Sequence, residues 1–232
     1  MQTQTLLKKV EGGEGEEFPF SLDSAVLGQD EVDAERRREK ERAQSQWAKF
    51  GPPGVYGRYE GGSFRTDTDE QRNAYNKTMA FPWADQEADG AKFASLALLG
   101  TPGTGKTHLA ALWLRQQVFA DGFEGQFITA AQLVREVRRA WDDRSVDETK
   151  VLERFGTIDS LVIDDIGVDI SEGVIRILME VLDMRLANDL TTCYTGCASP
   201  TQLKEIFGPR GFSRLMAKAR IVVLTGADQR MA

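Results

Sequence analysis

The sequence predicts an α/β domain of three layers, in which helices cover both faces of a parallel sheet. Short apolar runs alternate with longer segments of helical periodicity over most of the chain, and strands separated by helices pair in parallel. A glycine-rich loop joins the first of these runs to the first of these helices. Loops at the carboxyl ends of such strands build ligand sites in open α/β sheets. We therefore expect one such domain, preceded by an extension.

The expected elements follow from the spacing of the apolar residues. Strands are expected at residues 93–99, 126–129, 160–163, 191–195 and 220–224. Helices are expected at residues 106–118, 130–141, 171–187, 201–207 and 211–217. After the last strand we expect no helical lid domain, because residues 226–232 leave no room for one.

The first 55 residues differ in composition from the rest. Residues 1–27 are rich in Gly and Glu and carry few large apolar side chains, which predicts that most of them are disordered. Residues 29–50 favour a solvated helix that ends in a short apolar stripe, and the Gly-Pro-Pro-Gly run at 51–54 stops it. We expect residues 1–55 to form an extension and residues 56–232 the domain. The stripe either docks a partner protein or packs on the chain's own domain.

Composition excludes several classes of protein. Hydrophobic residues make up 41% and charged residues 28% of the 232 residues, close to the average for globular domains. No apolar run reaches the roughly 18 residues that a membrane span needs. Two cysteines and one histidine exclude a disulfide framework and a closed zinc site, so we expect a cytoplasmic setting. The net charge of −7 argues against nucleic-acid binding by the whole surface but leaves room for a local basic patch.

Residues 100–107 match the pattern G-x-x-x-x-G-K-[ST] at every fixed position. The glycines let the backbone wrap so that consecutive N–H groups face phosphates, and the following helix adds the positive end of its dipole. Lys106 is expected to reach the β- and γ-phosphates of ATP, and the Thr107 hydroxyl to ligate Mg²⁺. The expected nucleotide-binding residues are Gly100, Thr101, Pro102, Gly103, Thr104, Gly105, Lys106 and Thr107.

A second motif is the apolar stretch 161–163, which ends in two carboxylates. A phosphate site needs an acid at the carboxyl edge of a neighbouring strand to hold Mg²⁺ through water, and Asp164 suits that role. Asp165 is expected to polarise the attacking water. The alternative for Asp165 is a loop or helix-capping carboxylate, because the Asp side chain is shorter than that of Glu.

Three runs of sequence resemble the DnaC-type bacterial helicase loaders: GTGKTHLA at 103–110, VIDDIG at 162–167 and GPRGFSRL at 208–215. These loaders are AAA+ ATPases, and the transposition helper IstB is a close relative. The resemblance covers about residues 56–230. It implies a P-loop AAA+ domain that hydrolyses ATP as a ring or spiral of subunits. It also implies that the N-terminal extension docks on a hexameric DnaB-type replicative helicase.

The resemblance assigns roles to single residues outside the two motifs. Arg214 corresponds to the arginine finger that reaches the γ-phosphate of the adjacent subunit, and Arg210 is a second candidate. Arg230 corresponds to a late arginine that senses nucleotide in its own subunit. His108 stands where these families also carry His, and we expect it to be a structural hydrogen-bonding residue near the site.

The resemblance also implies that single-stranded DNA contacts the part of the domain that faces the central pore. The candidates there are Arg135, Arg138 and Arg139, whose positive charges suit phosphates. The alternative is that these arginines form an ordinary solvated face of their helix.

The sequence departs from the loaders after the fourth strand, where they carry a polar Asn that orients water. Cys197 falls at or beside that position, and a thiol is a poor hydrogen-bonding group. Together with Asp165 in place of Glu, this predicts a slow ATPase. The leading interpretation is a helicase loader in DNA replication. A transposition helper of the IstB type and a nucleotide-gated adaptor with little hydrolysis are the alternatives.

Overall fold

The computed structural model describes residues 29–60, 62–81, 95–142, 147–167, 171–226 and 228. The chain divides into two compact units, Met1–Arg38 and Glu39–Ala232. The described residues of the first unit, 29–38, form the first part of helix α1 (Gln29–Phe50). In this part, Nε of Arg37 donates to the backbone oxygen of Asp33 at 3.2 Å. The second unit holds every strand and all the other helices that the described residues form.

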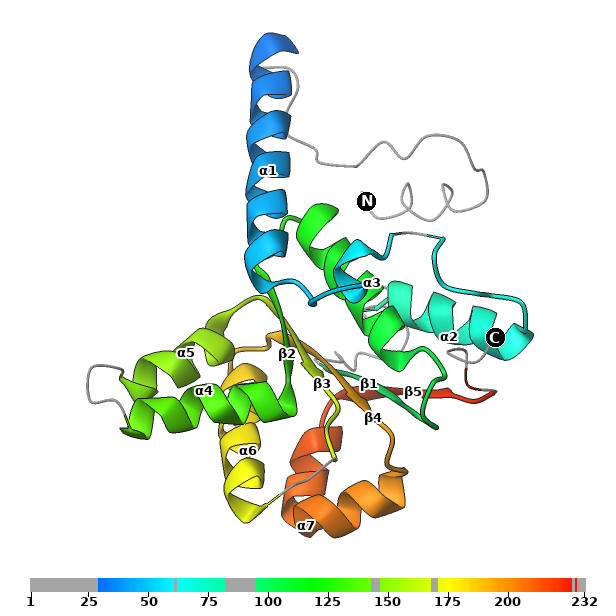
Figure 1. The fold of residues 1–232 in the computed structure, drawn as a ribbon, viewed down its shortest axis with the longest axis vertical. Coiled ribbons are helices and arrows are strands. Elements are labelled where there is room, and N and C mark those ends of the chain that lie inside the picture. Colours follow the sequence, from blue (N-terminus) through cyan, green and yellow to red (C-terminus); the bar gives the residue numbers. More distant parts are fainter. Residues whose placement is uncertain are drawn as a thin grey trace, which may run out of the picture. The chain divides into compact units, whose positions relative to one another are not determined.

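The second unit is built on a five-stranded sheet with the order β2-β3-β4-β1-β5 (Figure 1). All four neighbouring pairs are parallel, as expected for strands joined by helical crossovers. The first strand along the chain therefore lies inside the sheet, between the fourth and the fifth. The strands are β1 (Ser95–Gly100), β2 (Gly125–Thr129), β3 (Ser160–Asp164), β4 (Thr191–Gly196) and β5 (Ala219–Leu224).

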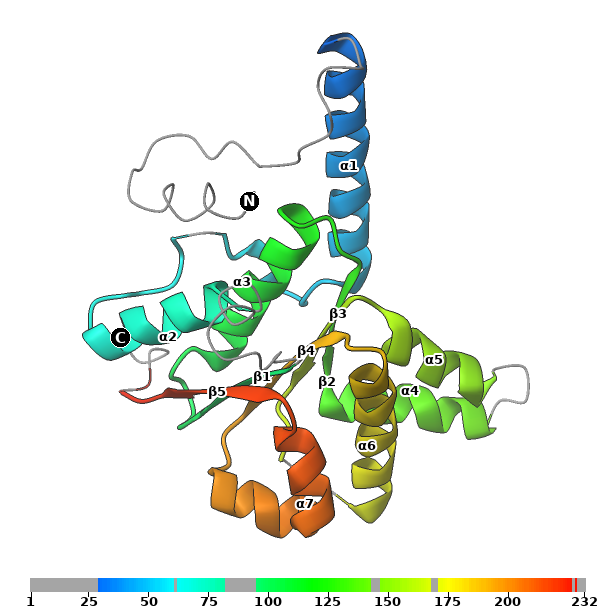
Figure 2. The same cartoon turned by 180° about the vertical axis from the view of Figure 1, so that it is seen from behind.

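Alternation along the strands produces two hydrophobic clusters, one on each face of the sheet. In β1, Leu96 and Leu98 join the cluster under α2 and α3, whereas Ala97 and Leu99 join the cluster under α4 to α7. Helices therefore cover both faces (Figure 2), which confirms the predicted fold class. The helices are α2 (Asp69–Met79), α3 (Lys106–Phe119), α4 (Ala130–Asp142), α5 (Glu148–Thr157), α6 (Glu172–Ala187) and α7 (Pro200–Met216).

The apolar pattern locates the five strands, and it predicts the helices that carry a clear apolar stripe. α7 contains both helices expected at 201–207 and 211–217, which meet at Gly208 in a non-helical conformation (φ 66°). The expected helices do not include α2, which is mostly polar, or α5, which carries only a short apolar stripe of Leu152 and Phe155. In the described part of the chain, no helix is long and apolar enough to cross a membrane.

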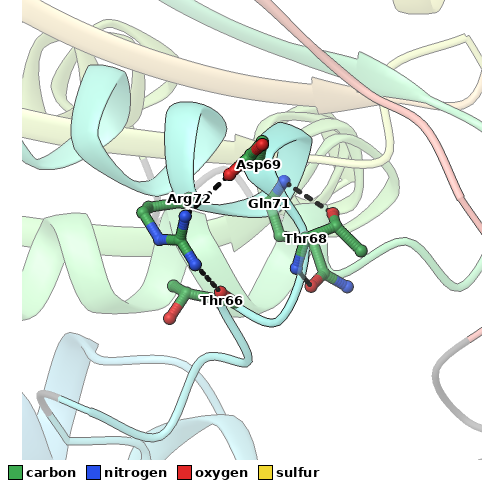
Figure 3. A network of polar contacts seen from close by, with 5 residues as sticks. All are labelled: Thr66, Thr68, Asp69, Gln71 and Arg72. Atoms are coloured by element: carbon green, nitrogen blue, oxygen red, sulfur yellow. Dashed lines mark hydrogen bonds and ion pairs between the residues drawn. The ribbon is translucent and has the colours of Figure 1, made fainter.

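The start of α2 is fixed by a capping box rather than by an apolar stripe (Figure 3). The Gln71 backbone N–H donates to Oγ1 of Thr68 at 3.2 Å, and the Thr68 N–H donates to Oε1 of Gln71 at 3.1 Å. Arg72 adds an ion pair with Asp69 at 2.7 Å and a hydrogen bond to the backbone oxygen of Thr66. The two bonds of the capping box satisfy backbone donors that the first turn leaves unpaired.

The apolar end of α1 packs within the second unit. The Trp47 ring meets the Phe119 ring of α3 edge-on, with centroids 5.8 Å apart, and its Nε1 donates to the backbone oxygen of Gly57 at 2.9 Å. The contacts of Trp47 therefore agree with the alternative in which the apolar stripe at the end of residues 29–50 packs on the chain's own domain. The docking role of residues 1–55, and a boundary after residue 55, stay predictions.

Arg185 of α6 joins that helix to β4 and to the end of α5. Its side chain is fully buried and donates five hydrogen bonds of 2.6–3.1 Å, four of them to backbone carbonyls. Burial lowers the pKa of Arg185 to about 9. The acceptors are Oγ1 of Thr192 and the backbone oxygens of Phe155, Ile158, Asp159 and Thr191.

Candidate functional site

The glycine-rich loop runs from the end of β1 to the start of α3, as its sequence predicts. Gly100, Gly103 and Gly105 all have positive φ angles, of 148°, 77° and 93°, which residues with a Cβ rarely adopt. A Cβ on Gly100 would lie 2.0 Å from the Leu224 carbonyl oxygen, and one on Gly103 would lie 1.9 Å from Oδ1 of Asp228. The loop therefore requires glycine for backbone conformation and for space. The packing of Asp228 on the loop is a contact that the sequence pattern did not indicate.

Lys106 lies inside this loop rather than on its surface. Its side chain is buried, and Nζ donates to the backbone oxygen of Thr101 at 2.7 Å. The Thr104 hydroxyl donates to the same oxygen at 2.9 Å. The loop is thus closed around an ammonium group, at the N-terminus of α3, where helix dipole and ammonium both favour an anion.

The end of β3 brings Asp164 to the start of α3. The Thr107 hydroxyl donates to Oδ1 of Asp164 at 3.1 Å, although 57 residues separate them in sequence. The carboxylate is held from the other side by Thr195 of β4, whose hydroxyl donates to the same oxygen at 2.6 Å. Because β4 lies between β3 and β1 in the sheet, Thr195 is placed to make this contact. The sequence analysis did not single out Thr195.

The electrostatics of Asp164 reflect its burial. Burial has the largest effect and raises the pKa of its carboxyl group above the ordinary value, and the charge of Asp165 raises it further. The hydrogen bonds from Thr195 and Thr107 and the charge of Lys106 act in the opposite direction. A bound cation would add a larger attraction of the same sign as that of Lys106.

Asp165 follows Asp164 in a left-handed backbone conformation with φ 58°. Its backbone N–H donates to Oγ1 of Thr195 at 3.1 Å, and the N–H of Ile166 donates to the Thr195 backbone oxygen at 2.8 Å. These two bonds hold the turn in a conformation that Asp tolerates better than most residues. Asp165 is exposed, whereas Asp164 is buried.

The oxygen atoms of Thr107 and Asp164 are donors of the kind that Mg²⁺ prefers. The described residues contain no cluster of three or more His, Cys, Asp or Glu side chains that could hold a metal ion. A site with so few protein ligands fits Mg²⁺ that arrives with phosphates, because Mg²⁺ keeps waters and takes substrate oxygens as its other ligands.

His108 is packed between residues that precede β1. Its ring stacks on Tyr59 with centroids 3.6 Å apart, meets Phe64 edge-on, and has Nε2 2.7 Å from the Ser63 hydroxyl. Burial lowers the pKa of His108 to about 4. A Cβ on Gly105 would lie 2.7 Å from the Phe64 ring, so the same aromatic group also contacts the phosphate loop. The segment before the sheet is thereby tied to the loop.

The other predicted residues lie at different places. Arg214 forms an ion pair with Asp183 of α6 at 2.5 Å on the surface, with 57% of its side chain exposed. Arg210 is exposed one turn earlier in α7. Cys197 is exposed just beyond the end of β4, so the polar side chain that β4 brings to Asp164 is that of Thr195. Arg230 lies outside the described residues.

The three arginines of α4 do not share one surface. Nη2 of Arg138 is 3.5 Å from the place that a Cβ on Gly173 would occupy, at the start of α6. Arg135 and Arg139 line a hollow that also includes residues of β2 and the end of α1. A spacing of four residues puts Arg135 and Arg139 on one helix face, whereas Arg138 is turned by about 100° from Arg139.

Comparison with known proteins gives a consistent picture. A family model described as "IstB-like ATP binding protein" matches residues 21–222. The replicative helicase loader DnaC of Escherichia coli strain K12 is 26% identical over 154 residues, which are 66% of this chain and 61% of that protein. The chain thus matches about three fifths of the length of this curated relative.

Solved structures show the same fold. A crystal structure of the DnaC helicase loader has a TM-score of 0.65 at 21% identity and covers 75% of this chain and 100% of that one. A crystal structure of DnaI has a TM-score of 0.62 at 21% identity and covers 75% of this chain and 95% of that one.

Proposed function

The chain belongs to the IstB-like ATP-binding family, and from this premise we propose that it loads a hexameric DnaB-type replicative helicase onto single-stranded DNA in an ATP-dependent reaction. The observation that carries the proposal is the meeting of Lys106, Thr107 and Asp164 at the carboxyl edge of the sheet. These three groups supply what a magnesium–triphosphate complex requires. The relatives named as helicase loaders favour this role over other uses of the same chemistry.

In this proposal, residues of the phosphate loop and of β3 bind different parts of the magnesium–ATP complex. Lys106 exchanges its bond to the Thr101 carbonyl for the β- and γ-phosphates, and backbone N–H groups of residues 100–107 surround the phosphates. Thr107 and Asp164 hold Mg²⁺, which neutralises charge on the phosphate oxygens. Thr195 keeps Asp164 oriented, and Asp165 orients the attacking water. The short side chain of Asp165 makes hydrolysis slow.

We propose that Arg214 completes the site of a neighbouring subunit in a ring or spiral. Its side chain is more than half exposed, and its partner Asp183 is also on the surface. Replacing this exposed ion pair by a contact between Arg214 and a phosphate therefore costs little stability. Arg210 is the alternative finger on the same helix, and Arg230 would contact nucleotide within its own subunit. His108 acts through packing, by fixing the first turn of α3 against Tyr59.

The DNA and helicase contacts are further parts of the proposal. The candidates for single-stranded DNA are Arg135, Arg138 and Arg139 of α4. Arg138 lies near the start of α6, and Arg135 and Arg139 lie on a separate face of α4. Residues 1–55 would dock on the helicase. The family match equally names IstB, so a transposition helper is the second candidate. A nucleotide-gated adaptor with little hydrolysis is the third, because Asp165 replaces Glu.

Co-purification separates the candidates. The tagged full chain is incubated with the DnaB-type helicase of its host, or with a transposase, with or without ATP and Mg²⁺. The proposal predicts ATP-dependent retention of the helicase, and loss of the ATP dependence in Lys106→Ala. Retention of the transposase alone would establish the second candidate instead. ATP binding without hydrolysis in the presence of helicase and DNA would establish the third.

A further inference from the structure

After β5 the chain meets the phosphate loop at two points. At the first, the carbonyl oxygen of Leu224 lies 2.0 Å from the place that a Cβ on Gly100 would occupy, because β5 pairs with β1 there. At the second, Asp228 lies against Gly103. Between them Gly226 has a φ of 126°, a conformation that glycine adopts more readily than other residues. The end of β5 therefore brings Asp228 onto the loop.

The contact at Gly103 is made by the carboxylate group of Asp228. A Cβ on Gly103 would lie 1.9 Å from Oδ1, 2.0 Å from Cγ and 2.6 Å from Oδ2 of Asp228. All three atoms of the carboxylate group therefore occupy the space that a side chain on Gly103 would fill. Asp228 is exposed to solvent, so moving it off the loop breaks no buried packing.

A carboxylate on the phosphate loop is unfavourable for phosphate binding. The glycines of such a loop let its backbone N–H groups approach the phosphates closely, and the Lys106 ammonium inside the loop adds the positive charge that attracts them. Charges act on one another over about 8 Å at physiological ionic strength. Phosphates held by these N–H groups lie within that distance of a group that touches Gly103. The Asp228 carboxylate therefore repels them.

Asp228 does not belong to the acidic groups that are proposed to act on magnesium and water. The proposed magnesium ligand Asp164 ends β3, and the charges that shift its pKa are those of Asp165 and Lys106. Asp228 comes from beyond β5 and lies on Gly103 instead. Its role therefore has to be sought in its contact with the loop.

We propose that Asp228 sets the affinity of the loop for nucleotide, because its carboxylate competes with the phosphates of ATP. The inference rests on the proposed binding of ATP by this loop and adds a residue that opposes that binding. ATP either pushes the carboxylate off Gly103 or binds against its charge, and both routes weaken binding. Asp228 thereby also speeds the release of bound nucleotide.

The test compares Asp228→Asn with the wild type in the full chain, because the amide keeps the size of the side chain and removes its charge. Fluorescently labelled ATP with Mg²⁺ measures binding, and a chase with unlabelled ATP measures release. We expect the variant to bind ATP about five- to tenfold more tightly and to release it more slowly, since one nearby like charge is lost. Inorganic triphosphate, used as a competitor, should gain by the same factor, because it carries the charges without base or ribose.

Two controls isolate the effect of the charge. Glu153→Gln removes an equal charge from the exposed surface of α5 and should leave the affinity for ATP unchanged. Salt screens charge repulsion, so the ratio of the Asp228→Asn affinity to the wild-type affinity should fall toward one as the ionic strength rises from about 0.05 M to about 0.5 M. Circular dichroism checks that each variant is folded.

Three results would overturn the inference. The first is equal binding of ATP by Asp228→Asn and the wild type. The second is weaker binding of ATP by the variant with unchanged binding of triphosphate, which would assign Asp228 to the ribose or the base. The third is a gain in affinity that salt does not reduce. If neither protein binds ATP or triphosphate, the proposed function fails and this inference fails with it, whereas equal binding by both proteins overturns the inference alone.

Discussion

The hydroxyl of Thr195 donates to Oδ1 of Asp164 at 2.6 Å and links β4 to the end of β3. The same hydroxyl accepts from the backbone N–H of Asp165. One side chain thus orients the proposed magnesium ligand and the turn that carries the proposed base. Outer-shell groups of this kind are worth about 10–100-fold in metal affinity or activity.

Thr195→Val removes both bonds while keeping the shape of the side chain. Because the lost donor lowers the pKa of Asp164, the variant raises that pKa and weakens Mg²⁺ binding. We expect the rate of ATP hydrolysis to fall about 10–100-fold, while nucleotide affinity measured without Mg²⁺ stays the same. Thr195→Ser restores the hydroxyl and should recover most of the rate. Equal rates in the Val and Ser variants would show that the hydroxyl has no such role.

Asp165→Glu lengthens the proposed base by one methylene. If the distance from the Asp165 carboxylate to the attacking water limits hydrolysis, the longer side chain should raise turnover by about tenfold, within the range that a well-placed general base contributes. The affinity for ATP should stay unchanged. Cys197→Asn is the companion variant, because it tests whether the thiol beyond β4 is the reason for slow turnover. Steady-state hydrolysis by the two variants separates these explanations. A slower Asp165→Glu enzyme would remove Asp165 from the proposed role.

Arg185→Met keeps the length of the buried side chain but removes its five donors. Four backbone carbonyls then lose a partner inside the protein. We expect the free energy of unfolding in urea to fall by about 3 kcal/mol or more, the size seen when buried polar networks lose a charged member. Arg138→Met, an exposed arginine in a helix, should change it by no more than about 0.5 kcal/mol. Similar values for the two variants would contradict the role of Arg185.

His108 gives stability a defined pH dependence. Its pKa is lowered from 6.5 to about 4 in the folded chain, so between these values the unfolded chain binds more protons. The contribution of His108 is therefore present above pH 6.5 and is lost as the pH falls through about 4. Urea unfolding of the wild type and His108→Gln, in EDTA without nucleotide, should show a stability difference that favours the wild type more at pH 7 than at pH 4.5. A difference independent of pH would contradict the shift.

Much of the fold could be predicted because its signals are local. Apolar runs mark β1 and β3 directly, and the residues 100–107 carry a spacing that few other loops share. α2 could not be predicted from apolar periodicity, and its start is fixed by the cap that Thr68 forms with Gln71. α5 also begins at a cap, Asp147, but its Leu152 and Phe155 form a short apolar stripe that periodicity could have indicated. The T-x-x-Q run was the available signal for α2.

The site was predictable only where its residues lie in motifs. Thr195 reaches Asp164 because β4 lies between β3 and β1 in the sheet. The order of strands in a sheet cannot be predicted from local sequence patterns, so this contact could not be predicted either. The division of the α4 arginines likewise depends on what packs against each face. Arg138 lies near the start of α6, and Arg135 lines the hollow that also includes residues of β2 and the end of α1. Sequence identifies these charges but cannot tell which surface each one serves.

The central claim is that Lys106, with Thr107 and Asp164, holds a magnesium–ATP complex at the end of β1. Isothermal titration of the full chain with ATP and Mg²⁺ tests it most directly, with Lys106→Ala checked for folding by circular dichroism. The account predicts saturable binding of one ATP per chain by the wild type and no measurable binding by the variant, which lacks the ammonium group for the phosphates. Tight ATP binding by a folded Lys106→Ala protein would contradict it.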